Sequence, residues 1–240
     1  MPFLLTFLAS ISTLLGGVLI FIKKQKNIII YSLAFAAGVM ITVSITDLIP
    51  EAFNLLTTTY NNFYSILLIL IFINIGIILS MIIDRFLPNN DELYRVGIVS
   101  MLAIILHNIP EGIITFITSS NDITLGITLT LAIAAHNIPE GITISLPIYY
   151  ATNNRKKAIF YTFISGISEF FGAIIAFLFL KPIVNDTNLG LLFAVIAGIM
   201  THISCYELLP LSFKYKKYRK TIMAFIIGCL FIIINSVIFH

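Results

Sequence analysis

The hexapeptide His-Asn-Ile-Pro-Glu-Gly occurs twice, at His107–Gly112 and at His136–Gly141, and each copy lies inside a long apolar stretch. On a helix, the His and the Glu of one copy lie roughly 40° apart around the axis, so they share a face. The proline between them lacks a backbone N–H, which leaves the carbonyl of residue 106 or 135 without its usual donor. Each copy is therefore a small polar face, and two such faces on neighbouring helices could surround a divalent cation.

The composition is that of a polytopic membrane protein. Of the 240 residues, 59% are hydrophobic and only 10% are charged, and the mean hydropathy is +1.04. A soluble globular domain of this length does not have such a composition. Runs of about 20 apolar residues, enough to cross roughly 30 Å of hydrocarbon, predict eight transmembrane helices, at 3–22, 28–51, 62–84, 95–118, 122–149, 158–180, 188–212 and 219–239. We therefore expect an all-α fold with a single transmembrane domain over residues 1–240.

The basic residues predict the orientation in the membrane. All but one of the 14 Lys and Arg residues fall in alternate connections, and only Lys181 falls in the others. The positive-inside rule then places the basic connections in the cytoplasm and both termini outside, in a multi-pass protein of the cell membrane (inner or plasma membrane). The first apolar run is followed, not preceded, by lysines, so we expect it to remain as a span and not to be a cleaved signal peptide. These connections also explain the net charge of +3 without nucleic acid as a partner.

The polar residues of three spans are expected at the same depth. The fourth and fifth spans are joined by a short connection and must run antiparallel, which puts both hexapeptides near the bilayer midplane. The midpoint of the sixth span is Glu169. A carboxylate at this depth costs about 2.5–3.5 kcal/mol to insert, and no Lys or Arg lies near mid-depth in these spans to neutralise Glu111, Glu140 and Glu169. Protons or metal must supply the counter-charge, and one or two divalent ions would balance it.

The ligand types narrow the choice of metal. Imidazole and carboxylate suit Zn²⁺, Fe²⁺, Mn²⁺ and their neighbours, whereas the lack of thiolates at this depth argues against Cu(I) and the imidazoles argue against a Ca²⁺ or Mg²⁺ cage. Met40, near the centre of the second span, could add a thioether. Cys205 and Cys229 lie in separate spans without CxxC spacing, so we expect no disulfide and no thiolate metal site.

Four further residues lie on either side of the midplane. Asp47 and Glu51 lie toward the outer face, and His202 and Glu207 toward the inner face. They are candidates for an entrance and an exit, and each is equally compatible with an ordinary solvated helix end.

Two other functions would also bury His and Glu in membrane helices. An intramembrane metal-dependent hydrolase is the first, but its usual H-E-x-x-H motif places a general-base Glu between two ligands on one helix, and this motif does not occur here. We therefore do not expect an enzyme. A protein that only packs helices or conducts protons is the second, and it would function without metal. Helix packing alone is the simplest reading of a single buried polar residue, but not of a hexapeptide duplicated at matched depth.

These segments resemble the ZIP (Zrt/Irt-like) family of divalent metal transporters, in its bacterial branch. The resemblance covers nearly the whole chain. It is carried by both hexapeptides and by Ala36–Met40, Leu48–Pro50, Ser165–Glu169, Ala197–Met200 and Glu207–Pro210.

The resemblance implies eight helices in a 3+2+3 arrangement, with the outer triplets related as inverted repeats. It implies import of divalent cations into the cytoplasm, zinc and also iron, manganese, cobalt or cadmium, with no prosthetic group. The family's metal-binding positions match His107, Asn108, Glu111, His136, Asn137, Glu140 and Glu169, with Met40 as an extra ligand. Expected partners are the metal ions and the lipid bilayer, with a homodimer as an option. Residues His202–Tyr206 depart from the family pattern, which leaves the exit route open.

Overall fold

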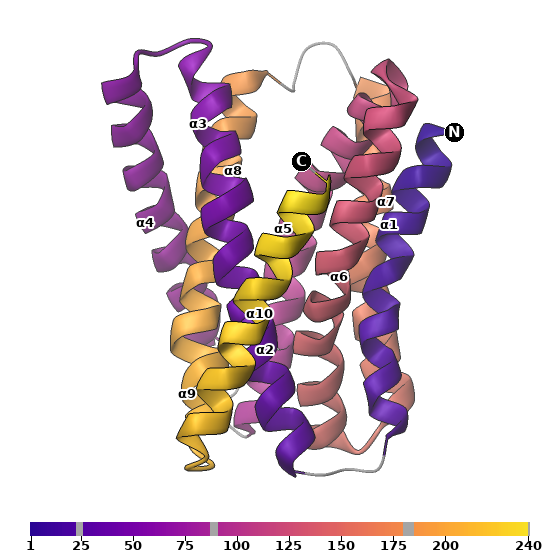
Figure 1. The fold of residues 1–240 in the computed structure, drawn as a ribbon, viewed down its shortest axis with the longest axis vertical. Coiled ribbons are helices and arrows are strands. Elements are labelled where there is room, and N and C mark those ends of the chain that lie inside the picture. The colour runs from indigo at the N-terminus through magenta and orange to yellow at the C-terminus, as the bar shows by residue number, and fades with distance from the viewer. Residues whose placement is uncertain (23–25, 87–90, 180–184, 240) are drawn as a thin grey trace.

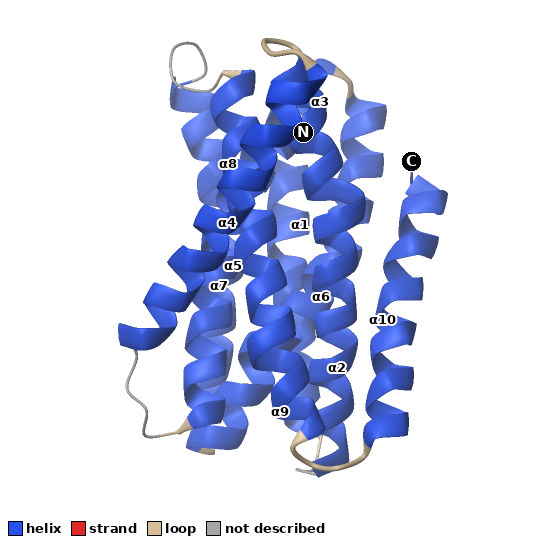
Figure 2. Ribbon diagram, turned by 90° about the vertical axis from the view of Figure 1, so that its left-hand side faces the viewer, coloured by secondary structure: helices blue, strands red, loops and turns tan. Residues whose placement is uncertain are grey.

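The fold is a bundle of eight helical rods. The computed structural model describes residues 1–22, 26–86, 91–179 and 185–239, and the regular structure within these ranges is helical (Figures 1 and 2). The rods are α1 (Pro2–Gly16) with the 3₁₀ turn η1 (Gly17–Phe21); α2 (Lys26–Val43), η2 (Ser44–Leu48) and α3 (Ile49–Thr57); α4 (Asn62–Phe86); α5 (Glu92–Asn121); α6 (Ile123–Thr152); α7 (Arg155–Phe179); α8 (Asp186–His202), η3 (Ile203–Leu208) and α9 (Leu209–Phe213); and α10 (Tyr218–Phe239). The prediction of an all-α fold with eight spans is confirmed.

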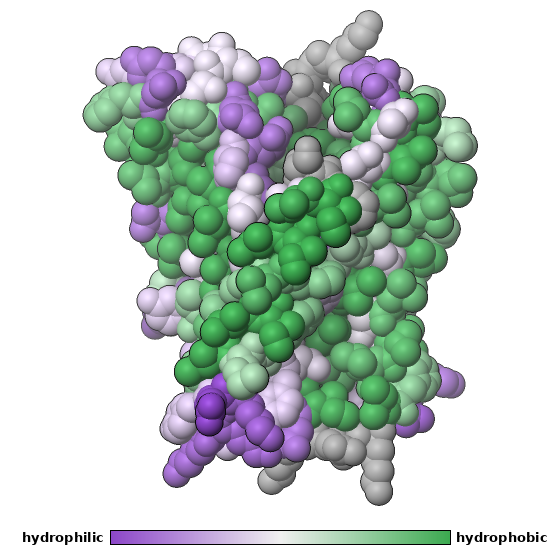
Figure 3. Space-filling model, in the orientation of Figure 1, coloured by the Kyte–Doolittle hydropathy of each residue, from purple (hydrophilic) through white to green (hydrophobic). Residues whose placement is uncertain are grey.

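The rods have the length and polarity of membrane spans. Within the described ranges, seven of them are long and apolar enough to cross a membrane. The eighth, α6, is 30 residues long, as α5 is, but it carries the second hexapeptide and is surrounded by α1, α2, α5, α7 and α10. Figure 3 shows a broad hydrophobic zone between hydrophilic ends. The protein is therefore a multi-pass membrane protein, and the part of α6 from the hexapeptide onward is buried among other helices.

The rods pack into two groups. The hexapeptide bundle consists of α1, α5, α6 and α7, and the companion bundle consists of α2 to α4 and α8 to α10. The most extensive contacts of each helix are made within its own bundle, and thinner contacts, chiefly of α2 and α10 with α6 and of α8 with α5, join the two (Figure 1). Both hexapeptides thus belong to one bundle.

The packing has the symmetry of an inverted repeat. Helix α1 packs on α6 as α7 packs on α5, and α4 packs on α8 as α10 packs on α2. Exchanging the first three rods with the last three, and α5 with α6, reproduces this pattern. The sequence repeats at equivalent points of α2 and α8, where Gly38, Met40 and Pro50 match Gly198, Met200 and Pro210. This is the expected 3+2+3 arrangement.

Glycine allows the helices of the hexapeptide bundle to approach each other closely. A Cβ added to Gly112 would overlap the carbonyl oxygen of Glu169 on α7, and one added to Gly141 would overlap the carbonyl oxygen of Thr13 on α1. Small residues at such crossings are the usual means of helix association in membranes. The last residue of each hexapeptide therefore sets the packing around the polar residues that precede it.

The long rods α2–α3 and α8–α9 are each interrupted by a π-helical segment. The segments η2 and η3 precede Pro50 and Pro210, which lack the N–H that an uninterrupted α-helix requires. Such wide turns are frequent at functional sites. Here η2 contains Asp47 and η3 contains Glu207, so two of the three predicted path carboxylates lie in irregular backbone, whereas Glu51 lies in α3.

The two ends of the molecule differ in charge. Figure 1 places both termini toward one end, and the α6–α7 and α9–α10 turns at the other. Arg155 and Lys156 begin α7 directly after the first of these turns, and Lys214 lies in the second. The predicted orientation also depends on three lysines that lie outside the described residues, Lys23, Lys24 and Lys181.

Candidate metal centre

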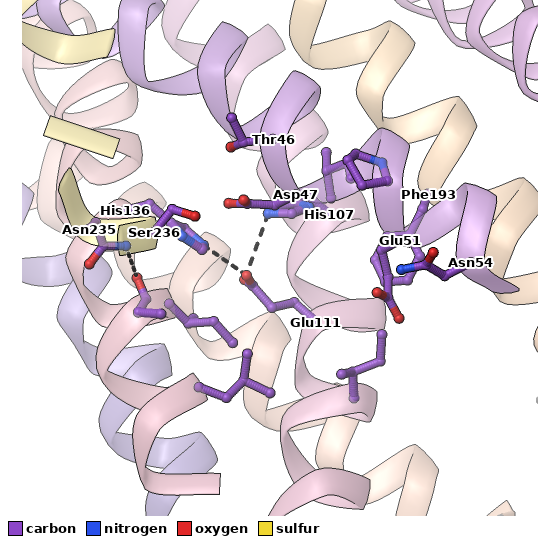
Figure 4. A pocket seen from close by; sticks show the side chains of 16 residues that line it. Thr46, Asp47, Glu51, Asn54, His107, Glu111, His136, Phe193, Asn235 and Ser236 are labelled. Atoms are coloured by element: carbon purple, nitrogen blue, oxygen red, sulfur yellow. Dashed lines mark hydrogen bonds and ion pairs between the residues drawn. The ribbon is translucent and has the colours of Figure 1, made fainter. Parts of the chain in front are cut away.

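The two hexapeptides meet in the middle of their bundle. The Nε2 atom of His136 lies 2.8 Å from Oε1 of Glu111, and Nε2 of His107 lies 3.7 Å from Oε2 of Glu111 and 3.7 Å from Oε1 of Glu140. All four side chains are buried. Figure 4 shows Glu111 reaching between the two imidazoles. The carboxylate of one copy thus faces the imidazole of the other, and the two copies form one cluster.

The spacing of these atoms suits a metal ion. One ligand atom each from His107, Glu111 and His136 lies within 4.8 Å of the other two. Nitrogen and oxygen ligands about 2.0–2.2 Å from a tetrahedral Zn²⁺ are roughly 3.3 Å apart, which falls within the separations observed. Both ring nitrogens of His107, Oε2 of Glu111 and both carboxylate oxygens of Glu140 are buried without a hydrogen-bond partner. Such atoms are costly unless a proton or cation satisfies them.

A second group of polar atoms lies on the α7 side of this cluster. The Nδ2 atom of Asn137 donates to Oε2 of Glu169 (2.9 Å) and to the carbonyl of Ala9 (3.2 Å), and Nδ2 of Asn108 donates to the carbonyl of Ser165 (3.1 Å). The side-chain oxygens of both asparagines and Oε1 of Glu169 have no hydrogen-bond partner. Because the two amide nitrogens already donate to neighbouring helices, the side-chain oxygens are the atoms that remain to bind a metal ion.

Met40 lies in a different setting from the other expected ligands. It is wholly buried on α2, just before η2, and belongs to the apolar cluster that joins α2 to α8. Its role as a ligand stays a prediction.

A cavity leads to the cluster from the end that bears the termini. Its volume is about 480 Å³, and it lies between the two bundles. Asp47 and Glu51 line it together with His107, Glu111 and His136 (Figure 4). The structure therefore brings the predicted entrance residues and the hexapeptides into one space.

The cavity also has lining residues that sequence reasoning did not single out. Asn54 of α3 and Asn235 and Ser236 of α10 contribute polar atoms to its wall, and Asn235 donates to the carbonyl of Ala132 on α6 at 3.2 Å. The sequence did contain one indication of this contact, because Asn235 is a polar residue near the end of the otherwise aliphatic last span. Its partner could not be known without the packing of α10 on α6.

The predicted exit residues lie elsewhere, at the opposite end. The Nδ1 atom of His202 is 2.9 Å from the hydroxyl of Ser80, and its ring stacks on Tyr206 with 5.0 Å between centroids. Oε2 of Glu207 lies 3.6 Å from Nη2 of Arg95. Neither His202 nor Glu207 lines the cavity. The predicted entrance residues and the predicted exit residues thus lie on opposite sides of the centre. The entrance residues line a cavity, whereas the exit residues contact other side chains. Cys205 and Cys229 are both free, as expected.

Comparison with known proteins identifies the family. Residues 89–236 match the family model described as ZIP zinc transporter. The chain is 40% identical to zinc transporter ZupT of Streptococcus mutans, with 99% of this chain and 97% of the relative aligned, and 41% identical to zinc transporter ZupT of Oceanobacillus iheyensis, with 95% and 94% aligned. Zinc transporter ZupT of Clostridium perfringens is 37% identical, with 100% and 96% aligned. The matching family is one of transporters, and the hydrolase alternative is set aside. The chain belongs to the ZIP zinc transporter family.

Proposed function

We propose that the protein imports divalent transition-metal cations into the cytoplasm, with zinc as the first substrate. The observation that carries the proposal is the His107, Glu111 and His136 cluster, buried at the inner end of a cavity that reaches it from the end bearing the termini. A cation bound there is close to fixed negative charge and yet accessible from one end of the molecule.

The donor set supports a range of ions. Imidazole nitrogen and carboxylate oxygen bind Zn²⁺, Fe²⁺, Mn²⁺, Co²⁺ and Cd²⁺, and the Irving–Williams order ranks the affinities of the four first-row ions without excluding any of them. Met40, if it approaches the ion during the cycle, would favour the softer members of this group.

The proposed path begins at Asp47 and Glu51, whose carboxylates attract the cation into the cavity. A primary ion is held by His107, Glu111, His136 and Glu140. A second position, built from oxygens, would use Asn108, Asn137 and Glu169 and share the carboxylates of the primary ion. His202 and Glu207 form the exit half of the path.

Transport then requires the centre to open to each side in turn. The close glycine contacts of Gly112 with α7 and of Gly141 with α1 bind α5 and α6 to their neighbours. We therefore infer that the hexapeptide bundle moves as one unit against the companion bundle, so that α1 and α7 move with the two metal-bearing helices. In the membrane, the end bearing Arg155, Lys156 and Lys214 faces the cytoplasm, and both termini lie outside.

Metal uptake by the purified protein in liposomes tests the proposal. Zinc and the four other ions are offered outside, with imposed pH and voltage gradients, and entry is read with an enclosed metal-sensitive dye. We expect zinc flux in the wild-type protein and its loss in Glu111→Ala. Glu92 is an exposed residue at the start of the same helix, so the control variant Glu92→Ala should transport zinc normally. Absence of flux for every ion under every gradient would leave a helix-packing or proton-conducting protein, and normal flux in Glu111→Ala would refute the metal assignment.

A further inference from the structure

Arg95 of α5 lies between two carboxylates of the companion bundle. Its Nε atom is 3.2 Å from Oδ1 of Asp84 on α4, and its Nη2 atom is 3.6 Å from Oε2 of Glu207 in η3. The side chains of Arg95 and Asp84 are each 21% exposed, and that of Glu207 is 7% exposed. We call these three residues the Arg95 bridge. It connects the two bundles at the end opposite the cavity.

Arg95 belongs to the same helix, α5, as two residues of the candidate metal centre, His107 and Glu111. Arg95 and His107 lie on the same continuous helix, about 18 Å apart along its axis at 1.5 Å per residue. A movement of the hexapeptide bundle that exposes His107 to the cytoplasm must therefore also move Arg95 relative to Asp84 and Glu207. The bridge resists that movement as long as its ion pairs hold.

The inverted repeat allows the carboxylate at the Arg95 bridge to be compared with its counterpart at the cavity. Asp47 of η2 and Glu207 of η3 occupy equivalent positions before Pro50 and Pro210. Asp47 lines the open cavity, whereas Glu207 lies against a guanidinium. Of two equivalent path carboxylates, one is thus available to a metal ion and the other is occupied by a cation of the protein itself.

A second ion pair at the same end provides a comparison. Lys214, which follows α9, contacts both carboxylate oxygens of Glu92 on α5, and so also connects the two bundles. These two side chains are 59% and 42% exposed. Exposed pairs of this kind are screened by water and salt and contribute little. The side chains of the Arg95 bridge are much less exposed, so water and salt screen their charges less.

We propose that Arg95 closes the cytoplasmic end of the path by acting as a tethered cation on the exit carboxylate Glu207 and on its neighbour Asp84. This inference rests on the proposed transport function. In the conformation described here, the guanidinium holds the inner ends of the two bundles together. When the bundles shift, Arg95 leaves, and the departing metal ion meets carboxylates that have lost their counter-charge. When the guanidinium returns, it competes with metal for the same oxygens and so disfavours re-entry from the cytoplasm.

Thiol accessibility at residue 204 tests the proposal. Ser204 is buried in η3 near Glu207, and its hydroxyl has no hydrogen-bond partner, so Ser204→Cys changes little else. The reporter is placed in a Cys205→Ser, Cys229→Ser background, and a membrane-impermeant thiol reagent is added to the cytoplasmic side. Arg95→Gln should raise the labelling rate about tenfold, a typical size for the coupling between two conformational states. Lys214→Gln, which removes the exposed pair between the same bundles, should leave the rate within about twofold.

A double-mutant cycle separates closure from general loosening of the fold. Glu207→Gln should also raise the rate, by less than Arg95→Gln because the contact between Arg95 and Asp84 remains. Combining both substitutions should add little to Arg95→Gln, which already removes the contact with Glu207. Arg95→Lys, which keeps the charge but not the two-armed geometry, should give a smaller rise. Thermal unfolding and gel filtration of each variant confirm that it is folded.

The labelling does not require metal, so its result is independent of the uptake assay. Absence of zinc uptake by the wild-type protein would overturn the transport function and leave the closure result standing. Unchanged labelling in both Arg95→Gln and Glu207→Gln, or an equal rise in Lys214→Gln, would overturn the role of Arg95.

Discussion

The imidazole of His136 and the carboxylate of Glu111 are 2.8 Å apart, although they belong to different copies of the hexapeptide on different helices. His107 likewise lies 3.7 Å from Glu140 of the other copy. A repeat of His and Glu could have formed two separate pairs, each on its own helix. The two crossed contacts instead join both copies into one centre, to which α5 and α6 each contribute a histidine and a glutamate, so α5 and α6 must keep their relative position for an ion to bind.

The first prediction concerns the packing that holds that position. Gly112→Ala and Gly141→Ala each place a methyl group on a backbone carbonyl of the neighbouring helix, Glu169 or Thr13. Overpacking of this kind costs about 1–3 kcal/mol, and the displaced helix would also move the hexapeptide residues. We expect a lower thermal unfolding temperature together with weaker zinc binding, measured on the detergent-purified protein.

Gly17→Ala is the matched control for both glycine variants. A Cβ at residue 17 would meet only Cβ of Ser145 at 4.0 Å, an ordinary van der Waals distance. This variant should be as stable as the wild type. If Gly112→Ala and Gly141→Ala are equally unaffected, the helices are not held at the separation described here.

The second prediction concerns the entrance. Asp47 lies in the cavity wall with His107 and His136, so its charge should raise the local concentration of cations. Asp47→Asn should raise the KM for zinc several-fold at low ionic strength and change kcat little. The difference should shrink at high salt, because exposed charges are then screened.

Asp186→Asn serves as the control for the entrance, because Asp186 is an exposed acidic residue of α8 that does not line the cavity. It should leave KM unchanged. A fall in kcat at constant KM in Asp47→Asn would show that Asp47 acts in the movement of the bundles and not in attracting the ion.

The sequence predicts the spans and the depth of the polar residues well, and the physical reason is simple. The length of an apolar run is fixed by the thickness of the membrane, so the midpoint of a run gives depth without knowledge of neighbours. Depth was enough to predict that Glu111 and Glu140 lie close together, because a short turn makes their helices neighbours. It also put Glu169 at their level, where it now contacts Asn137.

What the sequence did not predict depends on which helix packs against which. The hydrophobicity of a run shows that it is in the membrane but not which partner it has, since lipid and protein interiors are equally apolar. The position of Arg95 is the clearest example. In the sequence it is one of several basic residues at a connection predicted to be cytoplasmic, and only the packing of α4, α5 and η3 places it beside Asp84 and Glu207.

The third prediction is a pH dependence of uptake. Histidine and carboxylate ligands must be deprotonated to bind metal, so protons and zinc compete for His107, Glu111, His136 and Glu140. Lowering the external pH should therefore raise the KM for zinc, by at most about tenfold per pH unit for each proton displaced. At saturating zinc the effect should be smaller. The measurement is uptake into liposomes at fixed internal pH, and a KM that falls with falling pH would mean that protons drive transport more than they compete with the ion.

The last prediction is that the buried carboxylates are not equivalent. Glu111 lies within 3.7 Å of both imidazoles, and Glu140 lies at that distance from His107, whereas Glu169 contacts the amide of Asn137. Glu111→Ala and Glu140→Ala should thus abolish zinc uptake, because each removes a ligand of the primary ion. Glu169→Gln keeps an oxygen that can accept from Asn137 and loses only the charge.

We expect Glu169→Gln to retain part of the uptake, with a changed order of preference among zinc, cadmium and manganese, because the remaining oxygens of Asn108 and Asn137 are neutral. Competition between metals in the uptake assay, at matched expression, measures this order. Glu169→Ala, which also removes the acceptor for Asn137, should lose more activity than Glu169→Gln. Equal and complete loss in Glu111→Ala, Glu140→Ala and Glu169→Gln would show that a single site uses all three carboxylates at once, and the two positions for metal would then have to be replaced by one.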